Sequence, residues 1–148
     1  MRKVAILGIG QIKVDEIWEK SLREIGGEAA FLAMQDAGVD KVDALYVGNM
    51  LSSMVSGQNQ LGAFFGDWIG LWKQEAVKIE AACGSGAAAF RSALMAVASG
   101  EVESALVLGV EKMTDKAGKD VTAALATAAD ADYEGEQGIS FVGINALV

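Results

Sequence analysis

Apolar residues in this chain form short unbroken runs, separated by longer segments in which they recur at helical spacing. Short apolar runs bounded by glycine or polar residues are typical of buried strands. Four such runs predict strands at residues 4–9, 44–47, 77–82 and 104–110, and the longer segments predict helices at residues 22–37, 59–71 and 84–99. Strand and helix alternate, which predicts an α/β domain with a mainly parallel sheet and right-handed crossovers.

The ends of the predicted helices carry recognisable signals. Ser21 and Glu24 have the spacing of a capping box, which predicts that the first helix begins after Ser21. Gly38 and Gly100 stand where glycine commonly closes a helix. The polar residues 52–58 predict a loop, and from Thr114 onward the regular pattern breaks down until residues 139–148 resume an apolar, helical one.

The helix predicted at residues 84–99 has almost no polar face. Its apolar residues are mainly alanines, and they surround the helix: Ala87, Ala88, Ala89, Phe90, Ala93, Leu94, Ala96, Val97 and Ala98. A helix that is apolar all round is buried on all sides. One four-stranded sheet covers only one side of it, so the sequence predicts that the chain is part of a larger object.

Composition narrows the class of protein. The chain has 148 residues, of which 52% are hydrophobic and 22% charged, as in a globular domain. Its formal net charge of −8 argues against nucleic-acid partners, which require basic surfaces. The chain has a single cysteine and no histidine. These are too few ligands for a structural zinc site, and one cysteine cannot form an internal disulfide. No apolar run approaches the length of a membrane span, so we expect a cytoplasmic protein.

The single cysteine, Cys83, lies between a predicted strand and a predicted helix, followed by Gly84, Ser85 and Gly86. The free amides and partial positive charge at a helix N-terminus favour a thiolate, and they can hold the oxyanion of a tetrahedral intermediate. A nucleophile on a tight strand-to-helix turn is typical of acyl-transfer enzymes. The alternative is that Cys83 is a small buried hydrophobic residue.

Four segments resemble motifs of the thiolase family. Residues 80–89, EAACGSGAAA, look like the nucleophile motif Cys-x-Ser-Gly followed by a helix of small residues. Residues 47–50 and 57–59 look like the Gly-Asn-Val and Gly-Gln-Asn stretches, and residues 109–114 look like Gly-x-Glu-x-Met-Ser. From residue 133 onward the chain is most similar to archaeal-type and sterol-carrier-type thiolases.

The resemblance implies a fold of two similar halves in five layers, of which this chain holds the amino-terminal half and lacks the carboxy-terminal one. Residues 1–113 would form the amino-terminal α/β core, and residues 114–148 the truncated start of the loop domain. It also implies homodimers or homotetramers, a place in lipid metabolism and the mevalonate pathway, and, for the archaeal type, a complex with hydroxymethylglutaryl-CoA synthase.

The resemblance further implies an acyl-CoA C-acyltransferase that uses coenzyme A thioesters as substrates and no covalently bound cofactor. Cys83 would accept the acyl group, with Gly84, Ser85 and Gly86 supporting the oxyanion and the turn. Asn49 and Met113 are candidates for the pocket, against the alternatives of a structural turn role for Asn49 and core packing for Met113. Lys112, Lys116 and Lys119 are candidates for attracting CoA phosphates, against the alternative of ordinary surface lysines. Because no histidine or second cysteine follows Cys83, we expect this chain to be inactive alone. A non-catalytic scaffold subunit and a ketoacyl synthase-like condensing enzyme are the alternatives.

Overall fold

Three parallel strands form the centre of the molecule. The computed structural model describes residues 2–146, and its strands are β1 (Ala44–Gly48), β2 (Glu75–Ile79) and β3 (Ala105–Gly109). The strand order is β2-β1-β3, with Ala44 opposite both Glu75 and Ala105. Each outer strand therefore has β1 as its one hydrogen-bonded neighbour among the described residues.

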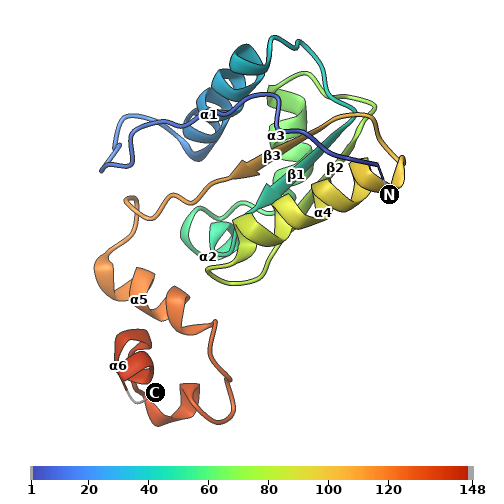
Figure 1. Cartoon of the computed structure of the whole chain (residues 1–148). Helices are drawn as coiled ribbons and strands as arrows, with labels where there is room; N and C mark the ends of the chain where they lie inside the picture. Colours follow the sequence, from blue (N-terminus) through green and yellow to red (C-terminus); the bar gives the residue numbers. More distant parts are fainter. Residues whose placement is uncertain (1, 147–148) are drawn as a thin grey trace.

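Helices cover both faces of this sheet (Figure 1). The elements before β2 are α1 (Leu22–Ala37), α2 (Ser52–Val55) and α3 (Leu61–Trp68), and those after it are α4 (Ser85–Ser99), α5 (Gly118–Ala126), the 3-10 turn η1 (Gly135–Gln137) and α6 (Phe141–Ala146). Helices α1 and α3 pack on one face and α4 packs on the other. The predicted α/β class with a mainly parallel sheet is confirmed.

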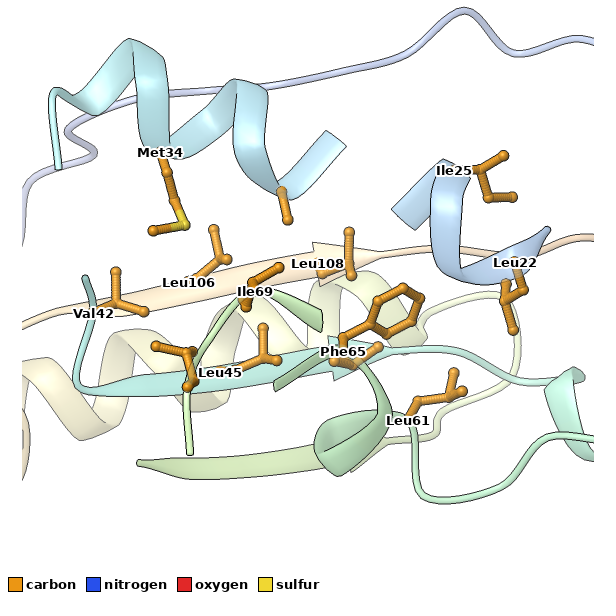
Figure 2. Packing of buried hydrophobic residues seen from close by; sticks show 13 residues of the cluster. Leu22, Ile25, Met34, Val42, Leu45, Leu61, Phe65, Ile69, Leu106 and Leu108 are labelled. Carbon is orange, nitrogen blue, oxygen red and sulfur yellow. The ribbon is translucent and has the colours of Figure 1, made fainter. Parts of the chain in front are cut away.

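The larger core lies between the sheet and helices α1 and α3 (Figure 2). Leu45 and Val47 of the central strand and Phe65 of α3 are completely buried there. The other face of β1 presents Ala44 and Tyr46 to the small side chains Ala89 and Ala93 of α4. All five residues of β1 are buried, as expected for a central parallel strand whose two faces are covered.

Helix α1 begins and ends where its sequence signals predict. Glu24 N–H donates to the Ser21 hydroxyl and the Glu24 carboxylate accepts from the Ser21 N–H, which completes the capping box. The hydrogen bonds that the Ser21 N–H and then the Ser21 hydroxyl donate to the Glu24 carboxylate lower the pKa of this carboxyl. Gly38 closes the helix with a φ of 66°. The predicted bounds of this helix are therefore confirmed.

The prediction of a strand at residues 4–9 is wrong. These residues form no strand, and Ile6, Leu7 and Ile9 are 69%, 67% and 76% exposed. The segment instead runs from the end of α4 to α1 (Figure 1), with its Gly8 and Gly10 close against the backbone of α1. An apolar run shows that a segment needs burial, but it does not show whether a pairing strand is available. The sheet consequently has three strands and not four.

Other boundaries shift by a few residues. Residues 52–55 of the predicted loop 52–58 form the short helix α2, and the helix predicted at 59–71 shortens to α3. The strand predicted at 77–82 lies at Glu75–Ile79. It ends there because residues 80–84 form a tight turn, with local bridges and turns from Ala81 onward. The helix predicted at 84–99 and the strand predicted at 104–110 become α4 and β3. Helix α6 confirms the helical pattern for most of residues 139–146, while positions 147 and 148 of that prediction lie outside the described residues.

Helix α4 is buried on one side only. Its inner side contains Ala89 and Ala93, whereas Phe90, Leu94 and Met95 on the outer side are 46%, 39% and 42% exposed. The prediction that one sheet covers a single side of this apolar helix is confirmed for residues 2–146.

After β3 the chain leaves the sheet and α5 packs on α2. Leu51 and Val55 bury Ala124 in a small separate apolar cluster. The division into residues 1–113 and 114–148 stays a prediction. In the part of the chain that the structure describes, no helix is long and apolar enough to span a bilayer.

Candidate active site

Cys83 lies in the turn that joins β2 to α4, and it is exposed. The alternative of a buried structural cysteine does not fit this position. The preceding residue, Ala82, has a φ of 46°, a left-handed conformation that non-glycine residues rarely adopt. Strained backbone of this kind clusters at functional sites, and a strained turn before a helix is the arrangement that exposes a nucleophile.

Ser85 holds this turn through its hydroxyl. The Ser85 Oγ donates to the Ala82 carbonyl oxygen at 2.6 Å and accepts from the Ala81 N–H at 2.9 Å. Ser85 is 4% exposed, so the hydroxyl acts inside the turn. Ser85 thus links residues 81 and 82 of the turn to the start of α4 through two hydrogen bonds.

The start of α4 offers unused hydrogen-bond donors. The Gly84 N–H donates to Ala81 and the Ser85 N–H donates to Ala82, both within the turn. Among the described residues, the next two amides, of Gly86 and Ala87, donate to no protein acceptor. Free amides at a helix N-terminus attract anions and stabilise a developing oxyanion when they point toward it.

Glycines allow α4 to begin directly against the sheet. A Cβ atom at Gly48, the last residue of β1, would lie 2.5 Å from the Ser85 carbonyl oxygen and 2.7 Å from the Gly86 Cα. A Cβ atom at Gly109, the last residue of β3, would lie 4.0 Å from the same Gly86 Cα. The beginning of α4 therefore rests against the carboxyl ends of both strands.

Asn49, predicted as a pocket residue, is 2% exposed, and it lines neither the cavity beside Met113 nor the one beside Phe64. Its Nδ2 donates to the Val110 carbonyl and to the Glu111 carboxylate, both at 2.8 Å. Sequence reasoning missed Glu111 as a functional candidate. The available signal was that Asn49 and Glu111 each follow a strand-ending glycine by one or two residues, at the same edge of a parallel sheet.

Met113 is 39% exposed and lines a cavity of about 340 Å³ between residues 10–15 and residues 109–114. None of the residues of the Cys83 turn lines that cavity. Met113 therefore lines this cavity without the residues of the Cys83 turn.

Lys112 is buried and bonded to Thr114 and Asp115. Its ammonium group is therefore not available to CoA phosphates, and that expectation is wrong for Lys112.

A family model described as the thiolase N-terminal domain matches residues 7–144. The chain belongs to the thiolase family. This thiolase chain is 42% identical, over its whole length, to an acetyl-CoA acetyltransferase of Methanothermobacter thermautotrophicus, and 41% identical to one of Methanocaldococcus jannaschii. It is also 32% identical, over 76% of its length, to a benzoylsuccinyl-CoA thiolase subunit of Thauera aromatica.

The thiolase chain spans 39% and 38% of the lengths of the two archaeal relatives. It is the amino-terminal portion of a thiolase, as the resemblance implied. Among solved structures, 3-oxoacyl-[acyl-carrier-protein] synthase III from Aquifex aeolicus superposes with a TM-score of 0.58 at 20% identity. That match covers 66% of this chain and 32% of the synthase, and at this identity it shows a shared fold.

Proposed function

We propose that this chain supplies the acyl-accepting half of an acyl-CoA C-acetyltransferase, with Cys83 as the nucleophile. The observation that carries the proposal is the exposed thiol on a strained turn, next to the unpaired amides that open α4. The names of the two archaeal relatives support acetyl-CoA as the substrate. No covalently bound cofactor is needed for this chemistry.

The proposed first step is acyl transfer to sulfur. The Cys83 thiolate attacks the thioester carbonyl carbon and forms a tetrahedral oxyanion, which the free amides of Gly86 and Ala87 would stabilise. When the carbonyl re-forms, the bond to the CoA sulfur breaks, and CoA leaves as a thiolate that takes up a proton. The acetyl group remains on Cys83 as a thioester.

The second step needs a base that this chain does not contain. A second acetyl-CoA must lose a proton from its α carbon before that carbon attacks the Cys83 thioester and releases 3-ketoacyl-CoA. The 148 residues contain no histidine and no cysteine besides Cys83, which are the residue types expected for this proton transfer. We therefore propose that the chain alone accepts an acetyl group without completing condensation or thiolysis.

The wider context of the proposal follows from the resemblance to archaeal-type thiolases. It comprises a homodimer or homotetramer in the cytoplasm, acting in the mevalonate pathway next to hydroxymethylglutaryl-CoA synthase. Pull-down and size-exclusion measurements on the native protein test these points separately from the chemistry.

The test of Cys83 is acetylation of the complete native protein by acetyl-CoA, read by mass spectrometry. Trypsin cleaves after Lys78 and Arg91, so Cys83 is the one cysteine of the peptide spanning residues 79–91. We expect this peptide to carry an acetyl group that is absent from Cys83→Ser and from urea-unfolded protein. An unmodified peptide in the folded native protein would contradict the proposal and favour a non-catalytic scaffold.

A further inference from the structure

The Glu111 carboxylate joins the segments that follow β1 and β3, at the edge of the sheet where α4 begins. Its Oε1 accepts from Asn49 Nδ2 at 2.8 Å, and its Oε2 accepts from the backbone N–H groups of Met50 and Leu51 at 3.1 and 3.0 Å. Three donors from the segment after β1 thus converge on one carboxylate from the segment after β3. Hydrogen bonds to an ionised acceptor are stronger than those between neutral groups.

Asn49 extends this connection to the third strand. Besides its bonds to Val110 and Glu111, its backbone N–H donates to the carbonyl of Ile79, the last residue of β2, at 3.2 Å. Its Oδ1 accepts from the Ser52 N–H at 3.0 Å. The pair Asn49 and Glu111, here called the strand-end clasp, therefore connects the carboxyl ends of all three strands.

The strand-end clasp contacts one side of the Cys83 turn directly and the other side through the residue next to Asn49. On the side before the turn, Asn49 is hydrogen-bonded to Ile79, four residues ahead of Cys83. On the side after it, Gly48, the neighbour of Asn49, lies against Ser85 and Gly86 at the start of α4. In Figure 1 the beginning of α4 and helix α2, which follows Asn49, lie at this same edge of the sheet. Movement of Asn49 would shift both flanks of the turn.

We propose that the strand-end clasp is a positioning unit that holds the Cys83 turn in the geometry required for acyl transfer. Glu111 is a positioning residue, because it acts through Asn49 and the backbone and touches neither sulfur nor substrate. The inference rests on the proposed function of Cys83 as acyl acceptor and adds the residues that keep the thiol in place.

A carboxylate is required at position 111 by the donors around it. All three groups that meet Glu111 are N–H donors, and an ionised carboxylate has only acceptor sites. Glutamine would keep one oxygen for Met50 and Leu51 but would turn an NH₂ group toward the NH₂ group of Asn49. The exchange Asn49→Asp with Glu111→Gln restores a donor–acceptor pair at this contact, although it loses the bond to Val110.

The opposite end of the same two strands provides a matched control. Asp43, just before β1, accepts from the Ser104 N–H and hydroxyl, both at 2.9 Å, and from the Glu103 N–H at 3.2 Å, just before β3. It is likewise a carboxylate that ties β1 to β3 through three donors, but it lies at the amino ends of the strands, away from the Cys83 turn. Asp43→Asn therefore reports the cost of loosening the strand pair without disturbing the turn.

The experiment measures the rate at which acetyl-CoA acetylates Cys83 in the complete native protein, together with the unfolding temperature of each variant. We expect Glu111→Gln to slow acetylation on the order of tenfold, since small misplacements of reacting groups are costly. Asp43→Asn should leave the acetylation rate unchanged even where it lowers the unfolding temperature. The exchange Asn49→Asp/Glu111→Gln should recover part of the rate lost in Glu111→Gln.

Three results would overturn the proposal. Acetylation as fast in Glu111→Gln as in the wild type shows that the clasp does not position Cys83, while the proposed function stands. If acetylation slows in both Glu111→Gln and Asp43→Asn in proportion to the decrease in their unfolding temperatures, the role of Glu111 is purely structural. If the wild-type protein itself is not acetylated, the proposed function fails first, and the positioning role fails with it.

Discussion

At the scale of single residues, the tightest constraint near the candidate site falls on Gly48. The space where its side chain would begin is occupied by backbone atoms of Ser85 and Gly86, which cannot swing aside as a flexible side chain could. For Gly86, on the other side of this contact, a Cβ would meet no heavy atom within 4 Å apart from its chain neighbours and the backbone of its own helix. The two neighbouring glycines therefore differ: a side chain at position 48 would clash with backbone, whereas position 86 has room for one.

Gly48→Ala should destabilise the protein, and Gly86→Ala should not. The added methyl at position 48 forces the start of α4 away from β1, at a cost of about 1–3 kcal/mol for overpacking. At position 86 the methyl enters open space within a helix, where alanine is favoured over glycine by up to about 1 kcal/mol. Thermal unfolding of the two variants beside the wild type measures the difference. Equal unfolding temperatures would contradict the packing argument.

The sequence predicted the candidate nucleophile but not its support. Cys83 could be found because a cysteine between an apolar run and a glycine-opened helix is a local pattern. The role of Glu111 depends on which strand lies beside β1, and strand order is not written in any local pattern. The bonds from Asn49 to Val110 and Glu111 span about 60 residues of chain and become visible only when β1 and β3 are placed side by side.

At the scale of elements, the contact between α1 and α3 explains two glycines inside a helix. A Cβ at Gly26 would lie 2.5 Å from the ring of Phe65, and a Cβ at Gly27 would lie 2.3 Å from the indole of Trp68. The helices approach closely because aromatic rings of α3 occupy the spaces left by these glycines. Phe65 is completely buried, whereas Trp68 is 43% exposed and stacks with Arg23, so the two rings differ in their freedom to move.

Gly26→Ala should therefore cost far more stability than Gly27→Ala. The ring of Phe65 has no free space to enter, so the methyl at position 26 opposes the packing of the main core and costs about 1–3 kcal/mol. Trp68 can rotate toward solvent, and the gain in helix propensity of about 1 kcal/mol offsets its displacement in Gly27→Ala. Chemical unfolding of both variants provides the measurement. A larger loss in Gly27→Ala would show that Trp68 is held more firmly than its exposure indicates.

Most elements follow from local patterns, and the exceptions have a common cause. The capping box of Ser21 and the closing glycines fix α1 and α4 because these signals act within a few residues. The apolar run at residues 4–9 looks the same as a paired strand, but pairing requires a neighbour at the right distance, which no local pattern specifies. The same limit explains why β2 ends before the turn at residues 80–84, although the apolar pattern continues.

At the scale of the whole molecule, several apolar side chains are left uncovered in the described chain. They include Phe90, Leu94 and Met95 on the outer side of α4, and Ile6 and Leu7 in the segment before α1. Grouped exposed apolar side chains mark surfaces that contact other protein. Because the chain spans about two-fifths of its archaeal relatives, we expect the remainder of a complete thiolase to cover α4.

Oxidation by peroxide should distinguish the isolated chain from the complete protein at Met95. In the 148-residue chain, Met95 is 42% exposed and should be oxidised readily, whereas Met34, 6% exposed in the core, should resist oxidation and so report that the chain is folded. In the complete protein we expect Met95 to become as resistant as Met34. Mass spectrometry of the two methionine peptides gives both rates. Unchanged oxidation of Met95 would mean that its side of α4 faces solvent in the assembled enzyme.

The unpaired edges of the sheet also matter during protein synthesis. The outer edges of β2 and β3 have no partner strand within residues 2–146, so each presents unpaired backbone groups to any extended chain nearby. Ribosomes add about 5–20 residues per second, and a full-length relative would display these edges for the whole time needed to translate its remaining three-fifths. We therefore expect the strand edges of the nascent amino-terminal part to stay unpaired while the rest of the protein is translated, so that chaperone binding matters most where neighbouring ribosomes make the same protein.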